Sequence, residues 1–178
     1  KRISAASLQY AVSESPAALI DACMPKILDV YHQNSHFDNI LMRNLLLGLQ
    51  IPTIIRVIGD SNFRTDMLSI LNSKIIATEI ELNPISLLET PRRLLDDIAL
   101  LNARYGIEIE SLIPCVICFS FPHKRTDYYE VLDDIRKVLR LNIKTISIAA
   151  LVLLNIYRAK IPSNNLLALF NLNRNRTN

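Results

Sequence analysis

Hydrophobic residues recur at helical spacing in the first part of the chain. Apolar side chains repeat every three or four residues from Leu19 to Tyr31 and again within Phe37–Leu49, as on the buried stripe of an amphipathic helix. In the second segment the residues expected to face inward are Ile40, Leu41, Leu45, Leu46 and Leu49. Ser15 and Pro16 precede the first stripe as an N-cap and a first-turn proline. Pro25 is expected to kink or split this helix, because its ring clashes with the preceding turn. The pattern therefore predicts two helices at the start of the chain.

The middle of the chain changes to short segments rich in β-branched residues. Pro52–Ile58 is predicted as a strand, followed by Asp66–Leu71 and Lys74–Leu82, which only Asn72 and Ser73 separate. A connection of two polar residues between two strands favours a tight β-hairpin. In that hairpin Asp66 stands opposite Glu79.

Helices and strands alternate in the rest of the chain. Thr90 and Pro91 begin a helix that ends near Gly106, with a competing start at Ser86 and Glu89. The later expected elements are a strand apolar on both faces at Leu112–Phe121, a helix at Asp127–Leu141, a short strand after Asn142, and helices at Ile148–Tyr157 and Ser163–Phe170. The fold class is therefore α/β, a mixed sheet of about four or five strands flanked by helices, with helical N- and C-terminal segments.

Composition favours one domain that spans residues 1–178. Half of the 178 residues are hydrophobic, 21% are charged, and only three are glycine, which allows a core of ordinary size and excludes collagen-like and low-complexity chains. The longest apolar runs, Ile146–Tyr157 and Leu112–Phe121, are shorter than the roughly 20 residues that cross a bilayer. We therefore expect no membrane segment.

The three cysteines argue against a disulfide scaffold and favour a reducing, cytoplasmic location. Cys115 and Cys118 match C-x-x-C, but on a strand residues three apart point to opposite faces. Two buried thiols are therefore expected rather than a zinc site or a redox pair. The chain begins at Lys1 rather than Met, with no signal-peptide pattern, so an upstream segment is left open.

Charge is distributed unevenly along the chain. The net charge is +3, yet residues 135–178 hold eight Lys and Arg and no acid, whereas residues 1–134 hold 12 basic and 17 acidic residues. A basic segment suits a polyanion such as nucleic acid. The alternative is a solvated helical face that complements helix C-termini.

The predicted hairpin gathers acidic side chains at its open end. Asp66 and Glu79 share one face, and Glu81, two residues further on, points to the same face. Like charges facing each other across strands destabilise a sheet unless a cation or water relieves the repulsion. Mg²⁺ prefers such oxygen ligands and supports water attack on phosphodiesters. The alternative is a solvent-exposed hairpin in which Arg64 pairs with Glu81, a weak surface ion pair.

The series of Asp66 at a strand start, a turn, Glu79-Ile-Glu81, a helix and the apolar strand Ile113–Phe119 resembles the core of the PD-(D/E)xK, or restriction-endonuclease-like, nuclease superfamily. The resemblance covers residues 37–147 and leaves 148–178 as a basic helical segment. Glu-x-Glu in place of Glu-x-Lys is similar to the BamHI-type branch of type II restriction endonucleases.

The resemblance implies a role for each acid. Asp66 and Glu79 would hold Mg²⁺, and Glu81 would stand where most members have a lysine that orients or activates water. Thr65 replaces the proline that commonly precedes the first acid. Many members add a glutamate from the first helix, but this chain has none between Glu14 and Glu79, so Asp38 is the nearest substitute.

The function expected from this resemblance is Mg²⁺-dependent hydrolysis of double-stranded DNA by a type II restriction enzyme. Cutting both strands of a symmetric site favours a homodimer, and the chain holds no nucleotide-binding fingerprint. One alternative is another nuclease of the same fold, such as a junction or repair enzyme or the cleavage subunit of a larger complex. The other is a non-catalytic module that binds nucleic acid or protein.

Two basic groups are candidates for DNA contact. Arg92 and Arg93 open the helix after the hairpin, and His123, Lys124 and Arg125 follow the apolar strand, where arginine and lysine suit phosphate and guanine. For the two arginines, the alternative is pairing with the acids at 96 and 97 along the helix. For the three residues after the strand, the alternative is an exposed basic turn without a role in binding. The histidines at 32 and 36 are expected at the surface, because no zinc-binding motif accompanies them.

Overall fold

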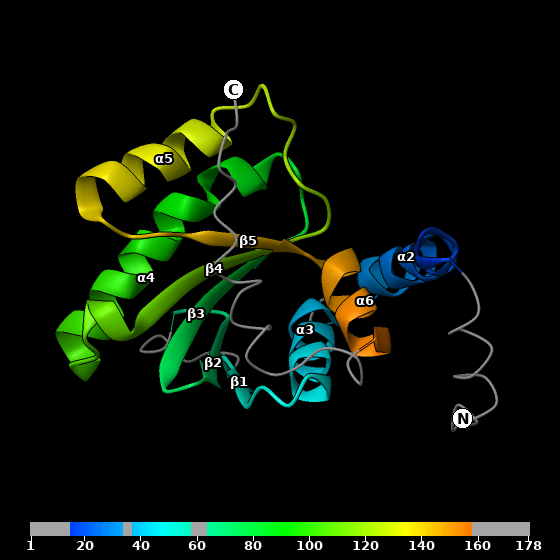
Figure 1. Cartoon of the computed structure of the whole chain (residues 1–178), viewed down its shortest axis with the longest axis horizontal. Helices are drawn as coiled ribbons and strands as arrows, with labels where there is room; N and C mark the ends of the chain where they lie inside the picture. Colours follow the sequence, from blue (N-terminus) through cyan, green and yellow to red (C-terminus); the bar gives the residue numbers. More distant parts are fainter. Residues whose placement is uncertain (1–14, 34–36, 58–63, 158–178) are drawn as a thin grey trace.

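The computed structural model describes residues 15–33, 37–57 and 64–157, which form one mixed β-sheet covered by helices (Figure 1). The strands are β1 (Thr53–Ile55), β2 (Met67–Leu71), β3 (Lys74–Glu81), β4 (Leu112–Cys118) and β5 (Lys144–Ser147). The helices are α2 (Pro16–Gln33), α3 (Phe37–Gly48), α4 (Thr90–Tyr105), α5 (Tyr128–Leu139) and α6 (Ile148–Tyr157), with short 3₁₀ turns at η1 (Ser86–Glu89) and η2 (Ile109–Ser111). The predicted α/β fold class with a mixed sheet is confirmed.

The five strands lie in the order in which they occur in the chain. β1, β2 and β3 pair antiparallel, and β3, β4 and β5 pair parallel. Two parallel strands need a crossover, and α4 and α5 supply the two crossovers on one face of the sheet, while α3 and α6 cover the other face (Figure 1). A hydrophobic core therefore lies on each side of the central strands.

The hairpin between β2 and β3 has the predicted register. Asn72 and Ser73 have positive φ angles of 48° and 63°, as a two-residue type I′ turn requires. Met67 faces Thr78 in the ladder, so the next position along the ribbon sets Asp66 opposite Glu79. This register brings the two acids together at the end of the hairpin away from its turn.

The central strand β4 carries the C-x-x-C residues as two buried thiols, as predicted. Cys115 lies in the core beside α3 and α6, and Cys118 in the core beside α4 and α5. Both cysteines are free, and burial raises the pKa of each thiol to about 12. Opposite faces and buried thiols exclude a shared metal site or a disulfide for this pair.

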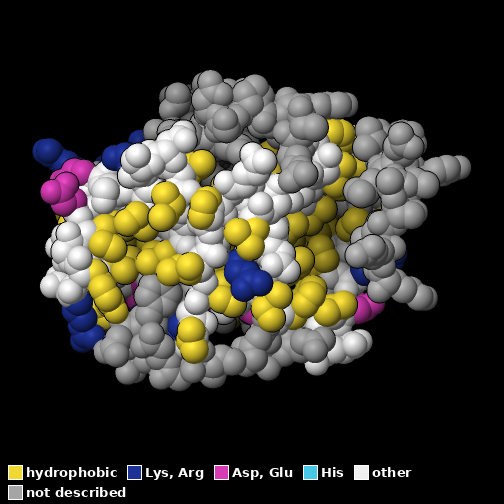
Figure 2. Space-filling view, turned by 90° about the horizontal axis from the view of Figure 1, so that it is seen from below, with side chains coloured by type: hydrophobic (Ala, Val, Ile, Leu, Met, Phe, Trp, Pro, Cys, Tyr) yellow, Lys and Arg dark blue, Asp and Glu magenta, His cyan; other side chains and the backbone are white. Residues whose placement is uncertain are grey.

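The sheet is covered unevenly. α4 contacts β3 and β4, and beyond them Ile54 of β1 and Ile70 of β2 are more than half exposed. Apolar side chains gather on the lower face of the molecule, where β1 and β2 lie (Figure 2). The centre of the sheet is thus buried on both faces, whereas Ile54 and Ile70 leave apolar surface exposed on β1 and β2.

The first helices differ from the predictions at two residues. Pro25, predicted to kink or split its helix, does not split α2, which runs unbroken from Pro16 to Gln33. The proline is exposed, so water can bond the carbonyl that loses its N–H donor. Ile40, predicted to face inward, is 45% exposed, and the buried residues of α3 are Met42 and Leu46.

The remaining boundaries agree closely with the expected ones. α4 ends as predicted at Gly106, whose left-handed φ of 66° ends the helix. The predicted helix at 163–170, the residues 58–63 and the histidine at 36 lie outside the described residues. None of the described helices has the length and apolar character that crossing a membrane demands.

Candidate active site

A polar pocket of about 340 Å³ lies where β3 ends and β2 begins. We call it the acid pocket, and it is lined by Asp38, Asn39, Arg56, Arg64, Asp66, Glu79, Ile80, Arg93 and Asp97. These residues come from the start of α3, the segments that follow β1 and precede β2, the end of β3, and the first half of α4. The hairpin register explains this meeting point, because β2 starts beside the end of β3.

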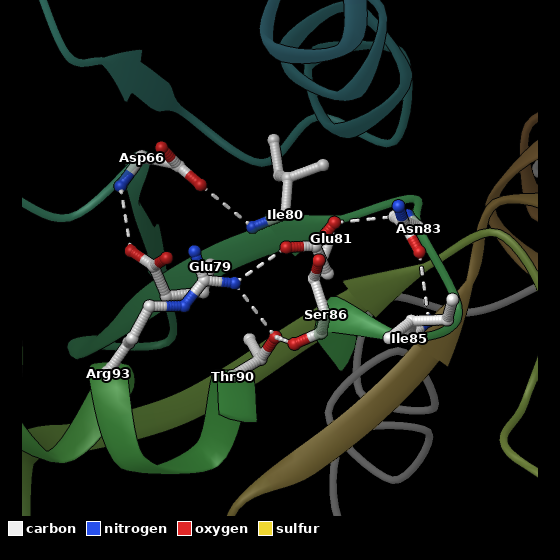
Figure 3. A network of polar contacts seen from close by, with 9 residues as sticks. All are labelled: Asp66, Glu79, Ile80, Glu81, Asn83, Ile85, Ser86, Thr90 and Arg93. Carbon is white, nitrogen blue, oxygen red and sulfur yellow. Dashed lines mark hydrogen bonds and ion pairs between the residues drawn. The ribbon is translucent and has the colours of Figure 1, made fainter. Parts of the chain in front are cut away.

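Asp66 and Glu79 are held across the hairpin by each other's strand. The backbone N–H of Ile80 donates to Asp66 Oδ2 at 2.9 Å, and the backbone N–H of Asp66 lies 3.4 Å from Glu79 Oε1, to which it donates (Figure 3). Backbone donors fix the orientation of a carboxylate more firmly than water does. The two acids predicted to face each other are therefore brought together.

Burial and neighbouring negative charge disfavour the ionised form of the carboxyl groups in the acid pocket. Glu79 is only 6% exposed, and burial, followed by the negative charges of Asp66 and Asp97, raises its pKa to about 9. Burial also raises the pKa of Asp66, against the opposing hydrogen bond from Ile80 and with a further contribution from Asp38. Without a bound cation, the pocket keeps a proton on Glu79 at neutral pH.

Asp97 is the third acid of this cluster. Its side chain is hydrogen-bonded to that of Glu79, and this bond raises the pKa of Glu79, so Glu79 donates the proton and Asp97 accepts it. Burial raises the pKa of Asp97 as well. Arg64 partly compensates, with its Nε 3.8 Å from Asp97 Oδ1.

We expect the metal-free protein to lose stability as pH rises. The unfolded chain loses the Glu79 proton near its ordinary pKa of 4.5, whereas the folded protein keeps it up to about 9. The contribution of Glu79 to the free energy of unfolding is therefore complete below pH 4.5 and is lost between pH 4.5 and about 9. Glu79→Gln should raise the free energy of unfolding at pH 8 by up to about 5 kcal/mol, at about 1.4 kcal/mol for each pH unit above 4.5, and flatten its pH dependence.

Urea unfolding in EDTA at pH 5, 7 and 8.5 measures this effect. Glu130→Gln is the matched control, since Glu130 is exposed on α5. Curves for wild type and Glu79→Gln that run parallel across this range would contradict the assignment of a buried proton to Glu79.

Glu81 does not join the other acids, contrary to prediction. It is absent from the pocket lining, because its Oε2 lies 2.7 Å from Arg93 Nη2 and its Oε1 accepts the N–H of Asn83 at 3.0 Å. The expected trio of Asp66, Glu79 and Glu81 is therefore replaced by one in which α4 supplies Asp97. The alternative ion pair between Arg64 and Glu81 is also wrong, since Arg64 pairs with Asp97.

Asp38, the proposed substitute for a first-helix glutamate, does line the pocket. It stands in the first turn of α3, where its Oδ1 accepts the backbone N–H of Asn39 at 2.8 Å. Asp38 therefore adds a fourth carboxylate to the acid pocket, opposed by the guanidinium groups of Arg56, Arg64 and Arg93.

The predicted DNA-binding residues separate into two groups. Arg93 lines the acid pocket, whereas Arg92 is exposed and pairs with Glu89 at 2.9 Å. The alternative, in which these two arginines pair with the acids at 96 and 97, is therefore wrong. The residues His123, Lys124 and Arg125 are exposed in the loop after β4 and do not line the pocket.

The basic end of the chain is described only up to Tyr157. On α5, Arg136 and Lys137 both pair with Asp133 on an exposed surface. For these two residues the structure matches the alternative of a solvated helical face. The basic residues after 157 lie outside the described part of the chain.

Sequence reasoning did not place five of the lining residues at the site, namely Asn39, Arg56, Arg64, Ile80 and Asp97. A signal existed for Asp97, because it falls between Leu94 and Leu101 on the buried stripe of α4. A carboxylate at helical spacing with buried leucines indicates a buried polar site rather than a surface ion pair. No comparable pattern marks Arg56.

The acid pair fits a hard divalent cation. Within residues 15–33, 37–57 and 64–157 no three His, Cys, Asp or Glu side chains are grouped closely enough to hold a metal. Mg²⁺ needs only one or two carboxylates, since water and phosphate fill its other positions. Asp66 and Glu79 offer two carboxyl groups that line the same polar pocket from opposite strands of the hairpin.

Comparisons of the chain with protein-family models, with curated proteins and with solved structures find no match. The interpretation of the site therefore depends on its own geometry.

Proposed function

We propose that the protein is a Mg²⁺-dependent DNA endonuclease of the restriction-endonuclease-like superfamily, with Asp66 and Glu79 as the residues that hold the ion. The observation that carries the proposal is the acid pocket, in which two carboxyl groups from opposite strands of a hairpin each accept a backbone N–H of the other strand, beside three arginines. A buried carboxylate next to another is costly unless a cation neutralises it.

The mixture of charges in the pocket favours a phosphodiester as the substrate. Guanidinium groups repel a divalent cation, so they are better suited to an anion that binds beside it. A phosphate brings negative charge and oxygen acceptors that arginine binds in a bidentate manner. Arg56, Arg64 and Arg93 lie close enough to line the same pocket as the acids.

The order of the elements supports the proposed superfamily. Asp66 precedes β2, the turn leads to Glu79 in β3, and α4 then connects to the apolar strand β4. This is the series on which the resemblance in the sequence depends. Because β3 pairs parallel with β4, Glu79 lies beside Val116 in the buried centre of the sheet. This is a rigid position for a catalytic group.

In the proposed mechanism the chain supplies orientation and charge. The Ile80 N–H orients the Asp66 carboxylate, and Asp97 accepts a hydrogen bond from the Glu79 carboxyl group while Glu79 is protonated. When bound, Mg²⁺ would neutralise the phosphate and supply a more acidic water as nucleophile. The arginines would hold the phosphodiester in line with that water.

A type II restriction enzyme that acts as a homodimer is the form we propose. Two equivalent sites related by a two-fold axis are needed to cut both strands of a symmetric sequence. The exposed loop with His123, Lys124 and Arg125, together with Arg92, would contact the duplex outside the acid pocket.

Incubation with plasmid DNA, with Mg²⁺ or with EDTA, tests the proposed function. Discrete fragments that require Mg²⁺ indicate a restriction enzyme. Smeared products, or a preference for branched DNA, indicate a junction or repair nuclease of the same fold. A protein that binds DNA but leaves every substrate uncut in Mg²⁺ would contradict the proposal and favour a non-catalytic binding module.

A further inference from the structure

Glu81 and Arg93 form an anchored ion pair beside the acid pocket. Arg93 Nη2 donates to Glu81 Oε2 at 2.7 Å and to Thr90 Oγ1 at 3.1 Å. Glu81 is itself held, because its other oxygen accepts the N–H of Asn83. One end of the guanidinium is therefore fixed to the end of β3 and the start of α4 (Figure 3).

Within the described part of the chain, the other end of the guanidinium has no hydrogen-bond partner. The hydrogen bonds of Arg93 to described residues all use Nη2, so Nη1 and Nε keep three N–H donors. Arg93 lines the acid pocket, and its charge lowers the pKa of both Asp66 and Glu79. In the view of Figure 3 the guanidinium lies between Glu81 and Glu79, with the side that does not bind Glu81 turned toward Glu79.

We propose that Arg93 binds the phosphate of the DNA strand being cut, and that Glu81 is a positioning residue which orients Arg93 rather than a metal ligand. This inference depends on the proposed nuclease function and assigns two of its residues. A planar fork with one nitrogen already anchored loses little side-chain entropy when it binds a phosphate in a bidentate manner.

Two observations exclude the obvious alternatives. Glu81 is no ligand for an ion between Asp66 and Glu79, since both its oxygens are engaged and it does not line the pocket. Arg92, the neighbouring candidate, pairs with Glu89 and lies outside the pocket. Arg93 is thus the arginine of α4 that can reach a phosphate held at the acids.

The first test measures DNA binding without cleavage. Fluorescence anisotropy of a labelled duplex in EDTA, over a range of salt concentrations, counts phosphate contacts through the slope of log Kd against log salt. Arg93→Ala should reduce that slope by about 1 and slow cleavage in Mg²⁺ by about tenfold. Arg93→Lys should keep the slope and still slow cleavage, because it loses the fork. Arg104→Ala, an exposed residue at the far end of α4, should change neither quantity.

The second test separates positioning from metal binding. Calorimetric titration with Mg²⁺ should give the same affinity for Glu81→Gln and wild type, and a lost signal for Glu79→Gln. In a double-mutant cycle, Glu81→Gln should slow cleavage in the wild-type background and have no further effect in Arg93→Ala.

The outcomes distinguish this inference from the proposed function. Wild-type protein that neither binds Mg²⁺ nor cuts DNA would overturn the nuclease function, and the roles of Arg93 and Glu81 with it. Wild-type protein that cuts DNA, together with an unchanged salt slope in Arg93→Ala or lost Mg²⁺ affinity in Glu81→Gln, would overturn this inference alone.

Discussion

Asp66→Asn and Glu79→Gln are each expected to slow DNA cleavage by on the order of a thousandfold, equivalent to about 4 kcal/mol of transition-state stabilisation. Each change keeps the size of the side chain and removes one of the two facing carboxylates that would hold Mg²⁺. DNA binding in EDTA should be nearly unchanged, because the arginines of the pocket stay in place.

Single-turnover cleavage rates in Mg²⁺ and anisotropy in EDTA measure the two quantities separately. Circular dichroism establishes that each variant is folded, which Glu79→Gln should be with a gain in stability at alkaline pH. Glu130→Gln and Asp96→Asn, both at exposed positions, are the matched controls and should cut at the wild-type rate. A folded Asp66→Asn that cuts as fast as its control would remove the acid pocket as the active site.

Asp97→Asn is expected to slow cleavage by about a hundredfold. Asp97 accepts the hydrogen bond from Glu79 and pairs with Arg64, so its charge sets both the protonation of one acid and the position of one arginine. Asparagine keeps the shape but cannot carry that charge. The Mg²⁺ concentration that gives the half-maximal rate should rise, and the maximal rate should fall.

The adjacent residue provides the control for this prediction. Asp96 has the same side chain one position earlier on α4 and is exposed, whereas Asp97 is buried. Rates for Asp96→Asn and Asp97→Asn, each measured from low to saturating Mg²⁺, give the comparison. Equal rates for the two variants would restrict Asp97 to a structural role.

The hairpin could be predicted because its determinants are local. A two-residue turn at Asn72 and Ser73 fixes which residues face each other, and a slip by one residue would turn every buried side chain to the other face. The pairing of Asp66 with Glu79 follows from that register alone. The helix and strand types were predictable for the same reason, since each depends on the period of its own apolar residues.

The orientation of Glu81 and the burial of Asp97 could not be predicted in this way. Both depend on where α4 lies against the sheet, and that position is set by contacts between residues distant in the chain. On the hairpin alone, Glu81 points to the same face as Glu79. The ion pair with Arg93, twelve residues later, takes it away from the other acids, and no pattern within the hairpin encodes that contact.

The position of α4 against the sheet therefore links the packing of the core to the arrangement of the acid pocket. Leu94 and Ile98 are buried against the sheet, and each directly follows a residue of the pocket, Arg93 or Asp97. A change of side-chain volume beneath this helix would shift its axis and carry a positive and a negative group with it. Fine adjustment of the reaction is thus accessible from positions that no substrate atom ever reaches.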